Sequence, residues 1–295
     1  IPKYLLHMMN QTDKYQFSIG EMQCTLFKDF NFNYRIQDYF NNVEMEVALE
    51  ALHYYNIKKD PIPSPYVALL IELKDKKILV DTGLGRRKDP LEFMGHQFVI
   101  DGRLIPILQE GNLLEDIDTV VVTHLHPDHA GGLFDEMGQC NFGDTEIIIH
   151  QAEWEYWTNK YTMGESPVFD YTVREQVMPL QDQNLKLISK QEYEIYPGIH
   201  LLKIAGHTPG QLAVHLSSEG EDFLYISDAW LHPLHIQHLD WTTIFDLDHQ
   251  QAKRTRIRLL EMAYDQAMIV QSFHFEFPGM GRIDKVTNGW NWVAS

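Results

Sequence analysis

Residues 120–132 read VVVTHLHPDHAGG, a β-branched run followed at once by three histidines and an aspartate in a turn. Such a run is typical of a buried strand. Side chains two positions apart on an extended segment point to the same side, so His124 and His126 can bind one cation. Asp128 and His129 can turn toward a neighbouring position. The stretch therefore predicts a metal site at a strand end, with two adjacent ions as the natural arrangement.

Three further residues stand in similar positions, each at the end of an expected strand and beside small or turn-forming neighbours. His207 lies in the sequence AGHTPG, Asp228 in ISDA and His274 in QSFHF. Each is weak alone, because a histidine beside Gly and Pro is usually a turn residue and an aspartate after a strand is usually a helix cap. The complete set, in this order, favours a metal centre over a chance cluster.

This set resembles the metallo-β-lactamase-fold hydrolases over about residues 66–285. The sequence VDTG at residues 80–83 is similar to the family's first motif, whose aspartate, here Asp81, orients the ligands from outside the metal site. The resemblance implies a four-layer αββα sandwich, an α/β fold in which two mixed β-sheets pack face to face with helices outside. It also implies the ligands: one metal would be held by His124, His126 and His207, the other by Asp128, His129 and His274, and Asp228 would bridge both.

Within this family the chain is similar to the branch of acyl-homoserine lactone lactonases and methyl parathion hydrolases. The similarity lies in DAWLHP at residues 228–233 and SFHFEFPGMG at residues 272–281. Asp228 stands where the true β-lactamases carry a cysteine, which disfavours antibiotic hydrolysis. Many of these lactonases place a tyrosine three residues after the bridging aspartate, where it helps to polarise the lactone. This chain has Leu231 at that position.

The chemistry implied by such a centre is hydrolysis. Two divalent ions sharing Asp228 would hold a water and lower its pKa from about 16 toward neutrality, which gives a metal-bridging hydroxide as nucleophile. Asp128 could carry the proton to the leaving group, and His232 is a second candidate. Imidazole and carboxylate ligands without a thiolate favour Zn²⁺, with Mn, Co or Fe as alternatives.

Aromatic and aliphatic residues follow the bridging aspartate in the sequence. The candidates for substrate contact are Trp230, Leu231 and Phe245, with Trp241 and Ile244 close by. Several N-terminal aromatic residues could cover them, namely Phe27, Phe30, Phe32 and Tyr34. Any one of these residues is equally well explained as part of the core. Together they favour a small, uncharged acyl lactone or ester as substrate.

The first hypothesis is therefore a lactonase that opens the ring of N-acyl homoserine lactones, an activity known as quorum quenching. The alternative is an organophosphate triesterase or arylesterase of the same fold, which would use the same bridging hydroxide. A further alternative is an iron-dependent oxidoreductase of this fold, although single-iron members use only part of the ligand set. A protein without catalytic function would have little reason to keep every ligand type.

Composition limits the partners and the location. The 295 residues include 24 Lys and Arg against 42 Asp and Glu, a net charge of −18 that repels nucleic acids and anionic membrane surfaces. The nearly apolar runs fall well short of the roughly 20 residues that span a bilayer, so we expect a soluble protein. The cytoplasm is slightly favoured, and a periplasmic or secreted location after signal removal stays open because the chain begins at Ile1. The resemblance also suggests a homodimer.

The sequence DPIPSP at residues 60–65 cannot be helical throughout, because proline lacks an N–H donor and biases its predecessor toward extended geometry. We expect residues 1–60 to form an N-terminal extension, lid or dimer arm, and residues 61–295 to form the catalytic domain. Helical periodicity marks residues 44–55, 152–161 and 250–266. Short β-branched runs predict strands at residues 66–73, 77–80, 119–123, 145–150, 199–204, 212–216 and 223–226.

Overall fold

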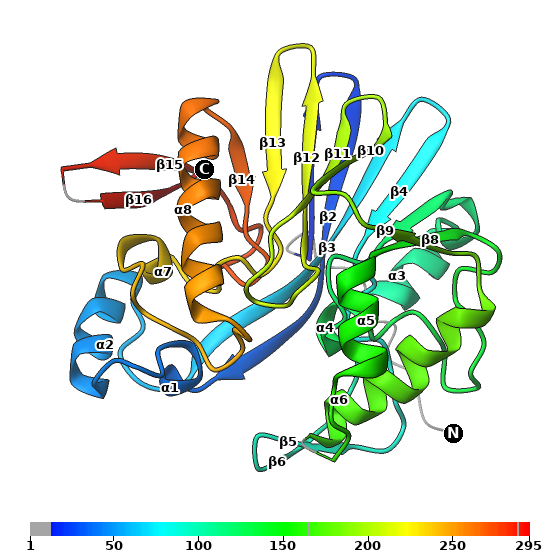
Figure 1. The fold of residues 1–295 in the computed structure, drawn as a ribbon, viewed down its shortest axis with the longest axis horizontal. Coiled ribbons are helices and arrows are strands. Elements are labelled where there is room, and N and C mark those ends of the chain that lie inside the picture. The colour runs from blue at the N-terminus through cyan, green and yellow to red at the C-terminus, as the bar shows by residue number, and fades with distance from the viewer. Residues whose placement is uncertain (1–12, 165, 288) are drawn as a thin grey trace.

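Two seven-stranded sheets pack face to face in the computed structural model, which describes residues 13–164, 166–287 and 289–295 (Figure 1). The first sheet has the order β1-β2-β3-β4-β7-β8-β9, the second runs from β10 to β16 in sequence order, and β5 and β6 form a small separate sheet. The strands are β1 Lys14–Ile19, β2 Met22–Tyr34, β3 Ile62–Leu73, β4 Lys76–Val80, β5 Leu91–Phe93, β6 His96–Phe98, β7 Thr119–Val121, β8 Glu146–His150, β9 Leu185–Ile188, β10 Glu192–Tyr196, β11 Ile199–Lys203, β12 Leu212–Ser218, β13 Glu221–Tyr225, β14 Ile269–Gln271, β15 Met280–Val286 and β16 Gly289–Ala294.

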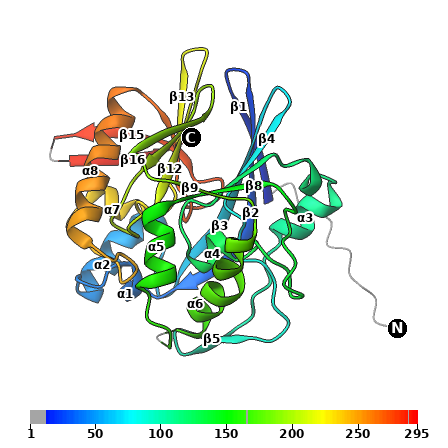
Figure 2. The ribbon, with the colours of Figure 1, turned by 45° about the vertical axis from the view of Figure 1, so that its right-hand side comes forward.

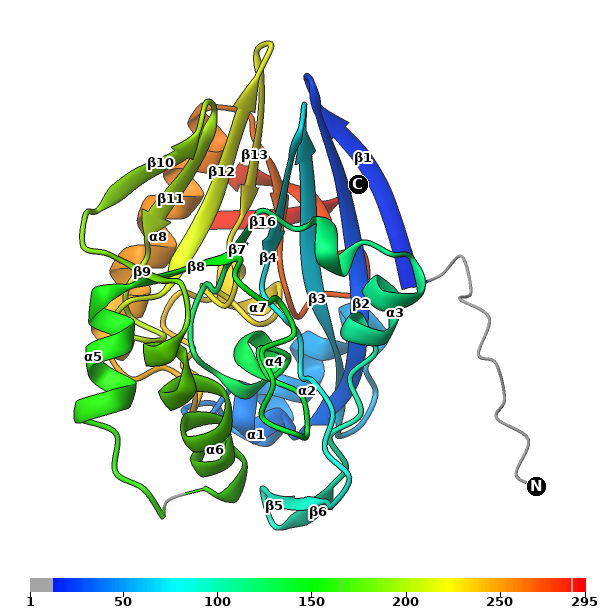
Figure 3. The same cartoon turned by 90° about the vertical axis from the view of Figure 1, so that its right-hand side faces the viewer.

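Helices cover the outer faces of both sheets. In the first layer α3 contacts β2 and α5 contacts β8 and β9, whereas α7 and α8 pack against β16 and β15 of the second sheet (Figures 2 and 3). This arrangement confirms the expected αββα sandwich. Of the described helices, none combines the length and the apolar character needed to cross a membrane. The helical segments are α1 Ile36–Tyr39, α2 Met45–Leu52, η2 His53–Tyr55, α3 Leu104–Glu110, η3 Leu114–Asp116, α4 Pro127–Ala130, α5 Gln151–Asn159, α6 Pro167–Tyr171, the π-helical η4 Thr172–Val177, η5 Met178–Asp182, α7 Leu234–Gln237 and α8 His249–Asp265.

Strand β3 shows how the layers are built from the sequence. Successive side chains of a strand point to opposite faces. Leu69 and Ile71 therefore lie in the core between the two sheets, whereas Ala68 and Leu70 lie in a second core beneath the helices of the first sheet. A third core lies between α8 and the second sheet. Because both faces of β3 are buried, residues 66–71 of this strand, YVALLI, form a continuous apolar run instead of an alternating one.

Parallel pairing brings the predicted ligands to one edge of the sandwich. Strand β4 pairs in parallel with β7, and β13 pairs in parallel with β14. The chain therefore leaves both members of each pair at the same edge. Asp81 and His124 follow the first pair, and Asp228 and His274 follow the second. His207 joins them from the loop between β11 and β12.

The N-terminal region differs from the expectation. Strands β1 and β2 belong to the first sheet, and β2 pairs with β3 along its length, from Gln23 opposite Glu72 to Tyr34 opposite Ile62. Residues 14–34 are therefore built into the sandwich, and the expected boundary near residue 60 is the entry into β3, not the limit of a separate lid. The predicted helix at residues 44–55 is present as α2 and η2. Residues 1–12 of the expected extension lie outside the described residues.

The other sequence-based elements agree well with the structure. The strands expected between residues 66 and 226 are β3, β4, β7, β8, β11, β12 and β13, and the two later helices are α5 and α8. Residues 104–115 carried no clear pattern and form the short α3 and η3. Strands β10 and β16 were not predicted, although their sequences, EYEIY and GWNWVA, alternate polar and apolar residues; both are short, and neither has a fully buried residue.

Candidate metal centre

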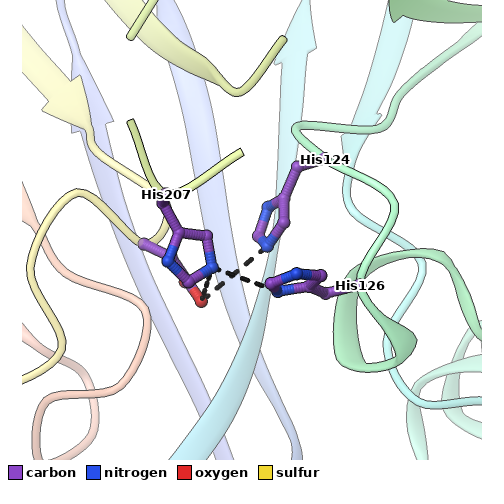
Figure 4. Close-up of side chains that lie close together, drawn as sticks. His124, His126 and His207 are labelled. Atoms are coloured by element: carbon purple, nitrogen blue, oxygen red, sulfur yellow. Dashed lines mark hydrogen bonds and ion pairs between the residues drawn. The ribbon is translucent and has the colours of Figure 1, made fainter. Parts of the chain in front are cut away.

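The seven predicted ligands lie together in two groups that share one aspartate. In each group the candidate ligand atoms lie within 4.8 Å of one another, and every residue is buried. The imidazole rings of the first group point toward one another (Figure 4). The groups are His124, His126, His207 and Asp228 in the first and Asp128, His129, His274 and Asp228 in the second.

Asp228 occupies the position between the two groups. Its Oδ2 lies 3.5 Å from Nε2 of His207 and 3.1 Å from Nε2 of His274. Its Oδ1 lies 3.3 Å from Nε2 of His129. One carboxylate thus faces histidines of both groups, which is the geometry that a ligand shared by two ions requires.

The ligand turn after β7 is shaped by a short helix. His126 has extended backbone geometry and precedes α4, and Pro127 takes the first helical position, where its missing N–H does no harm. The amides of His129 and Ala130 both bond to the carbonyl of His126. This tight turn reverses the direction of the chain, so that Asp128 and His129 face the second group while His126 faces the first.

Asp81 lies where the sequence placed it, directly behind the ligands. It is fully buried, and its Oδ2 accepts a hydrogen bond of 2.8 Å from Nδ1 of His129. The same carboxylate accepts bonds from the amide and the hydroxyl of Thr123, at 2.8 and 2.9 Å. The contact between Nδ1 of His129 and Asp81 fixes the ring so that Nε2 faces Asp228.

A second orienting carboxylate, Asp246, was not predicted from the sequence. Its Oδ1 lies 3.1 Å from Nδ1 of His207, and its Oδ2 accepts a 2.7 Å bond from the buried Arg256. Burial raises the pKa of Asp246, but Arg256 and then His207 outweigh it, so the net pKa is lowered and the group stays ionised. Asp246 therefore fixes His207 as Asp81 fixes His129.

Glu153 connects the two ligand loops and was also missed. It is fully buried at the first turn of α5. Its Oε1 accepts bonds from the amide of Leu125 at 3.0 Å and from the indole of Trp157 at 2.7 Å, and its Oε2 accepts from the amide of Gly210 at 2.9 Å. Leu125 lies between two predicted ligands, and Gly210 follows the third by three residues. One side chain thus holds loops from both sheets.

Several of the candidate ligand atoms form no hydrogen bond with other described residues, which suits them to metal ions. Nε2 of His124, Nε2 of His129 and Oδ1 of Asp228 are buried and have no hydrogen-bond partner among the described residues. Buried polar atoms without a partner are costly and uncommon in folded proteins. Imidazole nitrogens and carboxylate oxygens are standard ligands of zinc and related divalent ions. The two groups are therefore suited to binding metal.

The histidines of the site differ in their electrostatics: burial acts against protonation of His129, but Asp228, Asp81 and Asp128 hold its pKa well above the usual value. Burial, together with neighbouring histidines, lowers the pKa of His124 and His126 well below the usual value. Burial acts against ionisation of Asp228, but His274 and His129 hold its pKa well below the usual range. Burial raises the pKa of Asp128, with partial compensation from His129. Asp128 is thus the carboxyl group of the pair that more readily holds a proton.

A cavity opens beside the two groups. Five candidate ligands reach its wall, namely His126, Asp128, His207, Asp228 and His274. The remainder of the wall is aromatic and aliphatic, formed by Tyr34, Tyr39, Tyr66, Leu84, Phe93, Phe98, Pro127, Val168, Phe169, Leu231 and Phe245. The structure therefore places Leu231 and Phe245 at the cavity, as expected for substrate contacts.

Trp230 is a correction, because it is not among the described residues that line the cavity. After Asp228 the chain turns tightly, and Arg256 from α8 donates to the carbonyl of Ala229 at 2.7 Å. This turn buries Trp230 completely in the core between α8 and the second sheet. Trp230 is therefore a core residue, whereas the next residue, Leu231, lines the cavity.

His232 is a second correction, since it does not form part of the described cavity wall. Its ring packs against Phe40 and Tyr55, with centroids 5.7 and 4.9 Å away, and its Nδ1 accepts a bond from the amide of Leu234. Burial lowers the pKa of His232 to about 3. Near neutral pH this imidazole is neutral, and its remaining N–H is too weakly acidic to protonate a leaving group, so Asp128 is the better candidate.

The N-terminal aromatics are divided between wall and core. Tyr34 lines the cavity, and Phe32 packs at 5.5 and 5.2 Å from Phe93 and Phe98 of the wall. Phe27 lies in the core beneath the first-sheet helices. Of the nearby residues, Ile244 is exposed and Trp241 packs beside the central core. The sequence did not single out Tyr39, Tyr66 or Phe169, because no local motif marks residues that meet only in the folded chain.

Comparison with known proteins agrees with this geometry. Residues 62–270 match the family model described as the metallo-beta-lactamase superfamily. An N-acyl homoserine lactonase from a Bacillus species is 30% identical over 166 residues, which cover 52% of this chain and 59% of that protein. The N-acyl homoserine lactonase AiiB of Agrobacterium fabrum is 29% identical over 182 residues, covering 57% of this chain and 64% of AiiB. The matched region is thus less than two thirds of these relatives.

Solved structures show the same fold over nearly the whole chain. AidC, described as a dizinc quorum-quenching lactonase and solved with a homoserine product, has a TM-score of 0.80 at 22% identity and covers 96% of this chain and 97% of its own. The hydrolase AbOPH of the beta lactamase superfamily has a TM-score of 0.81 at 21% identity, covering 97% and 99%. At such identities the likeness concerns the fold.

Proposed function

The chain belongs to the metallo-beta-lactamase superfamily, and on this premise we propose that it is a dinuclear metal-dependent hydrolase that opens the lactone ring of N-acyl homoserine lactones. The observation that carries the proposal is the pair of buried ligand groups sharing Asp228. The names of the relatives, N-acyl homoserine lactonases, supply the substrate class.

The seven residues of the two groups would hold two divalent ions, with Zn²⁺ as our first choice. Bound metal supplies a Lewis acid and a water that ionises near neutral pH. The protein contributes orientation, because Asp81 and Asp246 fix the tautomers of His129 and His207. Ring opening leaves an alkoxide oxygen that needs a proton. Asp128 lies on the cavity wall and has a raised pKa through burial, so it is the side chain we assign to carry that proton.

The cavity wall suits an acyl chain better than a charged group. Beyond the candidate ligands, Phe93, Phe98 and Phe169 provide aromatic surface, and no Lys or Arg lies among the wall residues of this cavity. An anionic substrate would find no fixed positive side chain there, whereas an uncharged acyl lactone would bury its chain against apolar surface.

A phosphotriesterase or arylesterase is the second candidate, and Leu231 is the observation that favours it. This residue lines the cavity at the position where many lactonases of the branch carry a tyrosine. The side chain at this point therefore offers no hydrogen bond to a lactone carbonyl. A triester or aryl ester would be hydrolysed with the same ligand groups.

The test is a comparison of kcat/KM for the zinc-loaded protein on N-acyl homoserine lactones of several chain lengths, methyl parathion and p-nitrophenyl acetate. We expect the lactones to be hydrolysed fastest and metal analysis to give two ions per chain. Asp128→Asn should lower kcat/KM by about 10²–10⁴-fold. Asp75→Asn, in the exposed turn between β3 and β4, is the matched control and should change nothing.

Two results would redirect the assignment. Faster cleavage of methyl parathion than of any lactone would establish the second candidate. Failure to hydrolyse all three classes, with two ions bound, would reject the hydrolase and direct attention to iron content and oxygen uptake.

A further inference from the structure

Apart from the candidate metal ligands, the described wall residues with a polar side-chain atom are three tyrosines. Tyr34 ends β2, Tyr39 ends α1 and Tyr66 lies within β3, so segments far apart in the sequence bring them together. All three are buried, at 6%, 0% and 2% exposure. Among otherwise apolar neighbours, these hydroxyls decide which polar atom of a substrate can be recognised.

Two of these hydroxyls form a pair with a spare proton. The oxygens of Tyr34 and Tyr66 lie 2.7 Å apart, and either can be the donor. Each hydroxyl has a single proton, so one proton is used within the pair and the other is uncommitted whichever way the bond runs. The described residues provide no second hydrogen-bond partner for either oxygen. Tyr225 differs, because its hydroxyl donates to Asp81 and the carbonyl of Val67.

The pair lies beside the second ligand group. The ring centroids of Tyr34 and Tyr66 are 5.9 and 5.6 Å from that of His274. A phenol has an ordinary pKa of about 10, so both hydroxyls carry their protons near neutral pH and can act as donors.

We propose that the Tyr34–Tyr66 pair is the hydrogen-bond donor that the cavity presents to the reacting carbonyl group of the substrate. The inference rests on the proposed function for the identity of the substrate. It assigns recognition of one oxygen atom to two residues that no sequence motif marks. A donor fixed before the substrate arrives stabilises charge developing on that oxygen without reorganisation.

The shared bond leads to a distinctive pattern in variants. In Tyr34→Phe the hydroxyl of Tyr66 keeps its own proton, which is still available to the substrate, and the reverse holds for Tyr66→Phe. Each single variant should therefore lose only the alignment that the partner provides, about 2–10-fold in kcat/KM. The double variant keeps neither hydroxyl of the pair and should lose about 10²–10³-fold in kcat/KM. The loss in the double variant thus exceeds the product of the single losses.

The experiment measures both turnover and binding in zinc-loaded protein. Calorimetry measures the binding of an inert N-acyl γ-lactam analogue, in which N–H replaces the ring oxygen of the lactone. The double variant should bind this lactam about 10-fold more weakly than the wild type. The matched control is Tyr196→Phe, which removes a hydroxyl bonded at 3.0 Å to another hydroxyl, that of Thr119, away from the cavity. Thermal unfolding and metal content verify that each variant is folded and loaded.

The outcomes separate this inference from the proposed function. Weakened lactam binding in the double variant, in a protein that hydrolyses no lactone, would retain the donor pair and reject the proposed reaction. A double variant that binds the lactam and turns over lactones like the wild type would overturn the donor pair and leave the proposed function intact. Absence of lactam binding by the folded, loaded wild type would overturn both.

Discussion

Replacement of Asp81 by asparagine should disturb one metal group and leave the other largely intact. Oδ2 of Asp81 accepts three bonds, from Nδ1 of His129, the hydroxyl of Thr123 and the hydroxyl of Tyr225, and Oδ1 accepts one from the amide of Thr123. An asparagine has a single carbonyl oxygen. If that oxygen takes the place of Oδ2, the new amide group meets the N–H of Thr123, and a buried donor is left without a partner.

The magnitude follows from these contacts. A buried donor without an acceptor costs about 1–3 kcal/mol, and the three remaining bonds become weaker because they lose a charged acceptor. The removal of a buried charge offsets part of this loss. We expect Asp81→Asn to lower the free energy of unfolding of the metal-free protein by about 2–4 kcal/mol. Loss of a partner that orients a ligand typically lowers metal affinity by about 10–100-fold, and here this loss should fall on the group that contains His129.

The assay is chelator competition for each of the two ions, together with denaturant unfolding of the metal-free protein. Asp222→Asn is the matched control, because Asp222 also bonds a histidine, Nε2 of His215 at 2.7 Å, in a partly exposed pair on β12 and β13. Its effect should stay below about 1 kcal/mol, without change in metal affinity. Wild-type affinity for both ions in Asp81→Asn would refute the orienting role argued here.

Two further variants test two other buried carboxylates. Asp246→Asn should lower the affinity for the ion held by the group of His207 by about 10–100-fold. An equal loss of affinity for both ions would contradict the assignment of one orienting carboxylate to each group. Burial raises the pKa of Asp29 from 3.8 to about 6. The free energy of unfolding of the metal-free wild type, relative to that of Asp29→Asn, should therefore be highest below pH 3.8. It should fall by about 3 kcal/mol as the pH rises through about 6. Urea titrations of both proteins at pH 4, 5, 6 and 7 measure this difference, and a difference independent of pH would show that Asp29 ionises normally.

The ligands could be predicted because their signal is local. A metal site at the ends of strands depends on the residue types that follow a β-branched run, and such runs are visible at Val120 and again before Asp228. Parallel pairing then guarantees that these turns meet at one edge. Periodicity likewise revealed α8, since a long helix with one buried face repeats its apolar residues at a regular spacing.

The two misplaced residues show where local reasoning fails. Trp230 and His232 were expected at the site because they follow Asp228 closely in the sequence. The turn after Asp228 is held by Arg256, which is more than twenty residues away along the chain, and this contact directs Trp230 into the core under α8. Closeness in sequence therefore did not predict closeness to the metal groups, whereas a contact between distant segments determined it.

Glu153 illustrates why the remaining part of the site could not be read from the sequence. It stands in an ordinary helical pattern, and a glutamate there would be expected on the solvated face. Its carboxylate instead joins the amides of Leu125 and Gly210, one from a loop of each sheet. These bonds do not involve metal, so they hold the ligand loops of both sheets together before any ion binds. The two groups are therefore organised by the protein itself, and metal binding need not supply the free energy to bring the sheets' edges together.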